Sequence, residues 1–183
     1  MKTLATNSGD ALQWVQPKAL TRRYELRGGD HLYAALDFRS SMGTLAVAET
    51  SEGAWSFKRV GFLHPQVTVR LDGSEQDIAV YHPRFFGGGK IQIGSGTALQ
   101  WKSANFWSTK WGITDAADAP VMEFSQGIGG KAISDLFKTQ VSVEIQWHGA
   151  FDIPLVALAS LGMYLLLLQE SDASSAATVS ATS

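Results

Sequence analysis

Several basic residues are close together near the start of the chain and could bind an anionic surface. Lys18, Arg22, Arg23 and Arg27 all lie between positions 18 and 27, and side chains two or four apart on a strand share a face. Arg23 and Arg27 therefore share a face, but Glu25 lies between them and offsets much of their positive field. Each exposed cation adds about 1 kcal/mol of attraction near anionic lipid, so this patch predicts weak binding to an anionic phospholipid surface.

A second pair of cations is formed by Lys58 and Arg59, which are adjacent and therefore point to opposite sides of a strand. Arg59 shares its face with Trp55 and Phe57, which makes it a candidate for a paired, inward-facing charge. Lys58 is left on the outer face. The predicted lipid-binding residues are Lys18, Arg23, Arg27 and Lys58.

Aromatic residues suggest a second kind of contact. Three of the six tryptophans, Trp101, Trp107 and Trp111, are closely spaced. Such residues either fill the interior of a β domain or form an exposed patch at an interface with a partner or a membrane. Phe106 and Trp107, which are neighbours, are the candidate interaction edge.

Other chemistries have little support in the sequence. There is no Cys, and the four histidines do not have the spacing of metal ligands. The chain has no Gly-x-Ser-x-Gly motif, and Glu75 and Asp77 flank a turn. With 15 basic and 17 acidic residues the net charge is −2, which gives no strong field for nucleic acid. We therefore expect no enzyme, metal, cofactor or nucleic-acid partner.

The elements that position these residues are strands. From Leu12 to Trp147 apolar and polar residues alternate, as they do in Val141–Trp147, and glycine-rich turns separate the runs. This pattern predicts an all-β fold of antiparallel hairpins in a sandwich or a barrel. The expected strands are residues 12–16, 22–27, 31–39, 43–49, 54–62, 66–71, 77–82, 90–94, 97–102, 110–114, 120–124 and 139–147.

One apolar run follows the strands. Residues 153–168 contain no charge and would form a helix about 24 Å long at ~1.5 Å per residue. A helix that is apolar on all sides is either buried or inside a membrane, and a span usually needs ~20 residues. We expect a central helix over 153–169, with a tail anchor over 153–168 as the alternative. The small face of Thr44, Ala46 and Ala48 would let such a helix approach the sheet, or is simply exposed.

The ends of the chain have little apolar surface. Residues 1–11 have the composition of a disordered N-terminus without a signal peptide, which favours a cytoplasmic location. Residues 171–183 are small and polar, and they predict a disordered tail. The expected domain covers residues 12–170.

Three stretches resemble the tubby C-terminal-like superfamily, in particular its LURP-one-related and phospholipid-scramblase-like branches. They are Arg23–Arg27 (RYELR), Ser40–Glu49 (SSMGTLAVAE) and Trp55–Phe62 (WSFKRVGF). The resemblance covers residues 12–170 and implies a closed barrel of about twelve antiparallel strands enclosing one hydrophobic C-terminal helix.

The same resemblance implies a non-catalytic binding or structural module. Tubby-type domains bind phosphoinositides through a Lys-x-Arg pair, and scramblases have an acidic calcium-binding segment before the terminal helix. This chain has no Lys-x-Arg, and residues 146–152 contain a single carboxylate, Asp152. A calcium site usually needs several carboxylates, so the implied function is weak binding of anionic phospholipid, without calcium.

Overall fold

The computed structural model describes residues 1–4, 11–85, 87–94, 96–127, 140–147, 149 and 151–181, and it describes side chains as far as residue 177. The strands predicted at residues 120–124 and 139–147 correspond to observed strands at Pro120–Gln126 and Gln140–Ile145. Most of the segment between these two strands, residues 128–139, lies outside the described residues, and so does His148.

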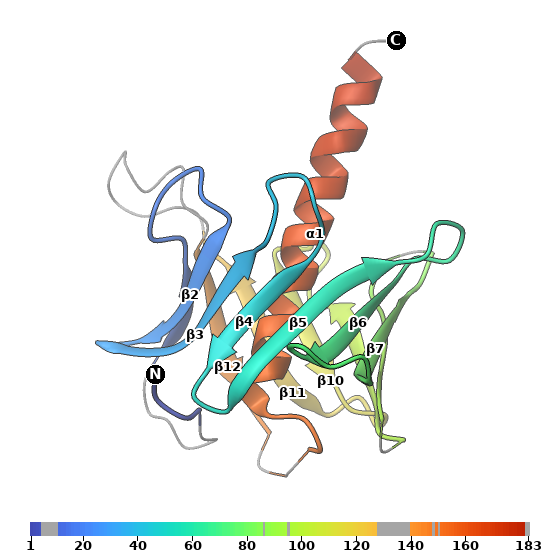
Figure 1. The fold of residues 1–183 in the computed structure, drawn as a ribbon. Coiled ribbons are helices and arrows are strands. Elements are labelled where there is room, and N and C mark those ends of the chain that lie inside the picture. Colours follow the sequence, from blue (N-terminus) through green and yellow to red (C-terminus); the bar gives the residue numbers. More distant parts are fainter. Residues whose placement is uncertain are drawn as a thin grey trace.

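Twelve antiparallel strands form a closed barrel in which each strand pairs with its neighbours in the sequence, and β1 pairs with β12 to complete the circle (Figure 1). This confirms the predicted all-β, twelve-stranded closed barrel. The strands are β1 (Leu12–Val15), β2 (Arg23–Gly28), β3 (His31–Phe38), β4 (Ala46–Thr50), β5 (Gly53–Val60), β6 (Gln66–Leu71), β7 (Asp77–Pro83), β8 (Gly89–Ile93), β9 (Ala98–Ser103), β10 (Lys110–Thr114), β11 (Pro120–Gln126) and β12 (Gln140–Ile145).

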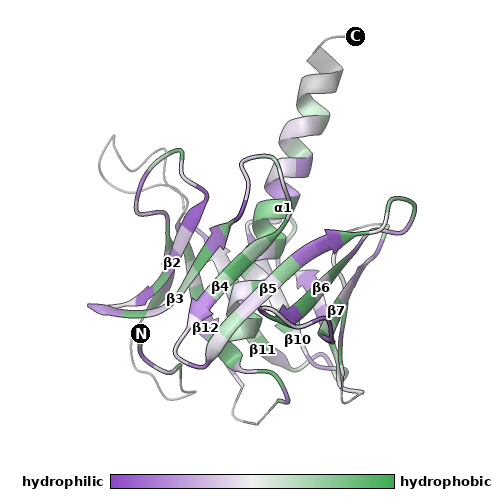
Figure 2. Cartoon of the chain, viewed as in Figure 1, coloured by the Kyte–Doolittle hydropathy of each residue, from purple (hydrophilic) through white to green (hydrophobic). Residues whose placement is uncertain are grey.

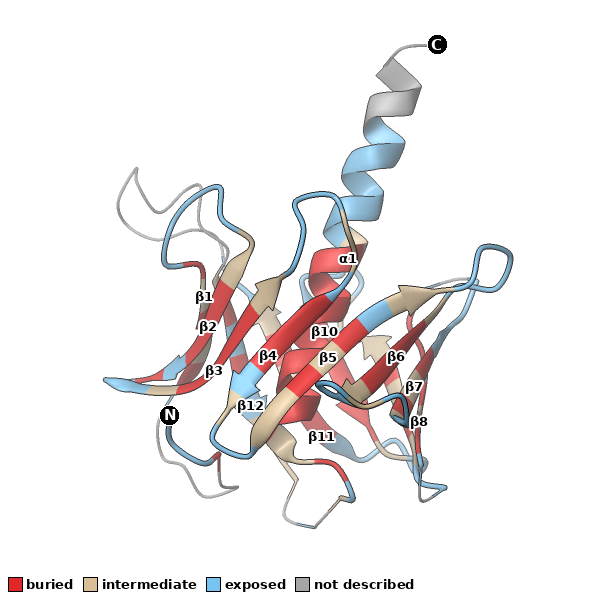
Figure 3. Ribbon diagram, in the orientation of Figure 1, coloured by how far each residue is buried: buried red, intermediate tan, exposed pale blue. Residues whose placement is uncertain are grey.

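The one helix among the described residues, α1 (Leu155–Ala181), passes through the barrel and projects beyond it (Figure 1). Residues 156–168 are buried on every side, which explains why this segment has no polar face (Figure 3). A helix long and apolar enough to cross a membrane is found at Leu155–Ala177, but 72% of its most apolar window is buried. The predicted central helix is therefore the core of the barrel.

Small residues allow the helix to lie close to the strands. Ala46 and Ala48 in β4 are fully buried in the core that includes α1, which supports the interpretation of residues 43–49 as a small face. On the opposite wall Gly162 contacts the ring of Phe124 so closely that a Cβ atom there would lie 2.1 Å from the ring's Cζ. This glycine therefore sets the distance between α1 and β11.

One tyrosine connects the helix to the backbones of strand β5 and of the loop between β3 and β4. The hydroxyl group of Tyr164 accepts a hydrogen bond from the backbone nitrogen of Arg59 (3.1 Å) and donates one to the carbonyl oxygen of Thr44 (2.6 Å). Its ring stacks between Phe38 and Phe57, with ring centroids 5.7 Å from each. These contacts fix the rotation of α1 within the barrel.

Both ends of the chain are more ordered than the composition predicts. Leu4 is buried and the backbone nitrogen of Lys2 donates to the carbonyl oxygen of Leu32 (2.8 Å); residues 5–10 lie outside the described residues. The helix also continues past Glu170 to Ala181, where a disordered tail was expected. Helix propagation from the buried part costs little, and the Arg59 guanidinium holds Asp172 through two hydrogen bonds of 2.9 and 2.5 Å.

Candidate functional site

The two ends of the barrel differ in the chemistry of their loops. In an antiparallel barrel with neighbouring connections, loops that follow odd-numbered strands share one end and loops that follow even-numbered strands share the other. We call the first the helix-exit end, because α1 leaves the barrel there (Figure 1), and the second the opposite end. The described helix-exit loops comprise residues 16–22, 39–45, 61–65, 84–88 and 104–109, apart from residue 86.

Large apolar side chains project from every one of these five loops. Each is 79–100% exposed, although side chains of this type are usually buried. In contrast, the most exposed large apolar side chains at the opposite end among the described residues are Met1, at 51%, and Leu71, at 46%. The apolar rim, as we name this set, consists of Leu20, Met42, Phe62, Leu63, Phe85, Phe106 and Trp107. The loops at this end include hydrophobic stretches in Figure 2 that are exposed in Figure 3.

Charges in the loops are also segregated. The five helix-exit loops contain four cations and no carboxylate: Lys18, Arg22, Arg39 and Arg84. The loops of the opposite end contain seven carboxylates and no Lys or Arg: Asp30, Glu52, Asp72, Glu75, Asp115, Asp118 and Asp152. The described loops at the two ends therefore differ in charge, although Arg39 forms an ion pair with Asp72 (3.7 Å) and α1 brings Glu170 and Asp172 to the helix-exit end.

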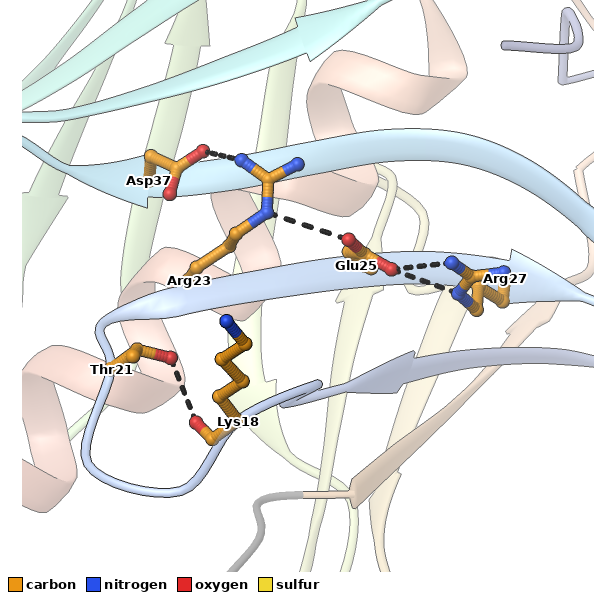
Figure 4. Close-up of polar contacts among 6 residues, drawn as sticks. All are labelled: Lys18, Thr21, Arg23, Glu25, Arg27 and Asp37. Atoms are coloured by element: carbon orange, nitrogen blue, oxygen red, sulfur yellow. Dashed lines mark hydrogen bonds and ion pairs between the residues drawn. The ribbon is translucent and has the colours of Figure 1, made fainter.

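The predicted basic patch on β2 is largely neutralised. Glu25 accepts hydrogen bonds from Arg23 Nε (3.4 Å) and from Arg27 Nη2 (2.7 Å), and Arg23 also forms an ion pair with Asp37 (Figure 4). Two guanidinium groups thus face two carboxylates on the outer wall, as the position of Glu25 in the sequence indicated. The structure brings Arg23 and Arg27 together, but with little net charge.

Lys18 and Lys58, the other two predicted lipid-binding residues, lie apart from this network. Lys18 is in the β1–β2 loop, where its carbonyl oxygen accepts from the Thr21 hydroxyl (2.7 Å) (Figure 4). Lys58 is in β5, three strands from β2 in the barrel order. Both side chains are exposed, and neither has a carboxylate within 4 Å among the residues that the structure describes.

Two arginines that were not among the predicted site residues organise the helix-exit end. Arg22 donates from Nη1 to the carbonyl oxygens of Ser40 (2.9 Å), Ser41 (3.0 Å) and Gly43 (2.9 Å), which joins the β1–β2 and β3–β4 loops. Arg59 pairs with Asp172 of α1, as expected for an inward-facing charge. The sequence could not show the carbonyl partners of Arg22, because they depend on how the β3–β4 loop is folded.

The candidate interaction edge belongs to the apolar rim. Phe106 and Trp107 lie at the tip of the β9–β10 loop, with their rings edge to face and centroids 5.3 Å apart. Asn105 supports the tip, because its Oδ1 accepts from the backbone nitrogens of Thr109 (3.0 Å) and Lys110 (3.1 Å). The two aromatic side chains are therefore held outward on a hydrogen-bonded turn.

The ionisable groups in the described ranges reflect burial and ion pairing. Burial raises the pKa of Tyr81 and of Tyr164 to about 12, and the Lys102 ammonium lowers the pKa of Asp118. The described residues contain no group of three or more His, Asp or Glu side chains able to hold a metal ion. Among these residues, the distinctive surface is the helix-exit end.

No protein-family model, no curated protein and no solved structure matches the chain.

Proposed function

We propose that the protein is a non-catalytic binding module that associates reversibly with an anionic phospholipid surface through its helix-exit end. The observation behind this proposal is the placement of seven exposed apolar side chains and all four cations of the described loops at one end of the barrel. Aromatic and aliphatic side chains enter the interfacial region of a bilayer, while cations contact the headgroups around them. The opposite end, with its seven loop carboxylates, would face away from the membrane.

Energetic estimates favour a weak, salt-sensitive interaction. Full burial of one large apolar side chain is worth about 1.5–3 kcal/mol, but loop tips at an interface bury only part of that area. Each uncompensated cation adds about 1 kcal/mol at low salt, and screening within ~8 Å reduces this at physiological ionic strength. Three cations support the proposal: Lys18, Lys58 and Arg84. None of them has a carboxylate within 4 Å among the described residues.

Burial of α1 supports a surface-binding module in preference to a tail anchor. Residues 156–168 contact the barrel on all sides, so the helix could enter a bilayer only if the barrel lost its core. The barrel and its central helix also support the proposal that the chain is a divergent member of the tubby C-terminal-like superfamily.

Co-sedimentation with vesicles tests the proposed function. We expect binding to vesicles of phosphatidylserine and phosphatidylcholine, and much weaker binding to phosphatidylcholine alone. The triple variant Phe62→Ser, Phe85→Ser, Phe106→Ser should lose binding, whereas Leu71→Ser, at the opposite end, should retain it. Unchanged binding by the triple variant would exclude the helix-exit end.

A charge series distinguishes this end from the β2 wall. Loss of Lys18 and Lys58 together, as Lys18→Gln and Lys58→Gln, should weaken binding on the order of 30-fold at low salt, at about 1 kcal/mol per cation. Loss of Arg23 and Arg27, whose charges are offset by Glu25 and Asp37, should have little effect. The reverse order of effects would show that the β2 wall is the binding surface.

A further inference from the structure

A cavity of about 250 Å³ opens at the helix-exit end, between α1, the strands β5 to β7 and the β7–β8 loop. Its walls are mainly apolar and include Val67, the Tyr81 ring, Leu165 and Leu168. At ~30 Å³ for each water-sized group it has room for roughly eight such groups. The cavity therefore fits a short chain or a small ligand, and is near the lower limit for small-molecule sites.

The cavity has an excess of positive charge at its opening. The residues that line it include two arginines, Arg59 and Arg84, and one acidic residue, Asp172. Asp172 is held by Arg59 through two hydrogen bonds, so these two charges offset each other. Arg84 contacts Gln100 Oε1 at 3.5 Å and has no carboxylate within 4 Å among the described residues. One cation is therefore left to face a ligand.

Glycines keep the β7–β8 loop close to the barrel and the cavity open. The Tyr81 hydroxyl donates to the carbonyl oxygen of Gly88 (2.7 Å), which holds the loop over the tyrosine. A Cβ atom at Gly88 would lie 2.4 Å from the carbonyl oxygen of Trp101, and one at Gly89 would lie 2.3 Å from that of His82. Larger residues at these positions would displace the loop that carries Arg84.

We propose that this cavity binds the anionic end of a single-chain amphiphile, with a short acyl segment against Val67, Leu165 and Leu168 and a carboxylate or phosphate on Arg84. Guanidinium groups bind both kinds of anion through paired hydrogen bonds. The apolar wall selects against small inorganic anions, and the single uncompensated cation selects against neutral and cationic amphiphiles. This inference rests on the proposed function, because it names the lipid chemistry that the helix-exit end recognises.

Octanoate, an eight-carbon carboxylate, tests the cavity without any membrane. We expect octanoate below its micelle concentration to raise the Tm, because a ligand that binds the native state alone stabilises it by mass action. Octylammonium, which has the same chain and the opposite charge, should give no such shift. Equal shifts with both compounds, or none with octanoate, would overturn the inference.

Arg84→Gln provides the site-directed test. The side chain is exposed, so the variant should fold, and circular dichroism and the ligand-free Tm verify this. A hydrogen bond to a charged group contributes about 1.5–3 kcal/mol, so octanoate affinity should fall about tenfold or more. Lys90→Gln, which removes an exposed cation from β8 outside the cavity, should leave it unchanged. Equal affinity in Arg84→Gln and the unaltered protein would exclude the cavity.

Vesicle binding separates the two proposals and the two sources of the ligand. Octanoate binding together with competition between octanoate and anionic vesicles supports a membrane lipid as the natural ligand. Octanoate binding without any vesicle binding supports a free amphiphile and overturns the proposed function alone. Vesicle binding in a protein that does not bind octanoate overturns the cavity alone.

Discussion

The ring of Phe124 in β11 occupies the space beside Gly162 in α1 that a side chain at position 162 would require. A Cβ atom there would lie 2.1 Å from the ring's Cζ. Gly162→Ala should therefore force the helix or the ring to move, and overpacking of this kind costs about 1–3 kcal/mol. At about 2–4 °C per kcal/mol for a chain of this size, thermal unfolding should show a clear fall in Tm.

Gly112→Ala is the matched control for that prediction. Gly112 is also buried, but a Cβ atom there would be 3.7 Å from the carbonyl oxygen of Met122, an ordinary contact. Its Tm should change much less. Similar losses in both variants would indicate that the barrel has little tolerance for added methyl groups in general.

Tyr164→Phe should destabilise the protein through its backbone partners. Removal of the hydroxyl leaves the Arg59 amide and the Thr44 carbonyl without their partner on α1, and an unpaired buried polar group costs about 1–3 kcal/mol. Tyr24→Phe is the control, because Tyr24 is also buried and its hydroxyl has no hydrogen bond to any residue that the structure describes. Urea titration of both variants compares the free energies of unfolding.

Leu161→Asp decides whether α1 is the core of the barrel in solution. Leu161 is fully buried, and an unpaired carboxylate is very costly in such a place, so the whole domain should lose its cooperative unfolding transition. Ala173→Asp, in the exposed part of the same helix, should change little. A tail anchor would give another result, since a barrel that folds without the helix would keep its transition in Leu161→Asp.

Alkaline pH should destabilise the protein through its buried tyrosines. Burial raises the pKa of Tyr81 and of Tyr164 from 10.0 to about 12. Between pH 10 and 12 the unfolded chain loses these protons while the native protein keeps them, so the free energy of unfolding falls as pH rises. Below pH 10 neither tyrosine contributes to the pH dependence.

Absorbance and denaturation measurements test the alkaline prediction. The tyrosinate absorbance should rise in at least two phases, and the later phase should be smaller in the variant Tyr81→Phe, Tyr164→Phe. The slope of stability against pH above 10 should also be shallower in this variant. An unchanged slope would assign the alkaline effect to other groups.

Local sequence patterns were sufficient to predict the strands and the helix. Apolar residues alternate because each strand has one face toward α1 and one toward solvent, and glycine turns separate the hairpins. Closure into a barrel depends on β1 pairing with β12, which no local pattern indicates. The extension of α1 past Glu170 was missed because it depends on Asp172 meeting Arg59 of a distant strand.

The candidate site was less predictable, because it is distributed over five loops. Phe106 and Trp107 were recognised as neighbours in the sequence, but single residues such as Leu20 and Met42 give no signal until the loops are assigned to one end. A signal was nevertheless present. Once twelve strands are numbered, alternate loops must share an end, and the carboxylates of the described loops then separate from the cations of those loops.

Pairing of the first strand with the last has a consequence for folding. Leu12 lies opposite Val143, so closure of the barrel joins segments that are far apart in the chain. Because closing so long a loop costs conformational entropy, we expect this pairing to form late in folding. Before closure, β1 and β12 would be two unpaired edges next to an open apolar interior, a state prone to intermolecular strand pairing. Refolding yield should therefore decline as protein concentration rises, even though the native barrel presents no free edge.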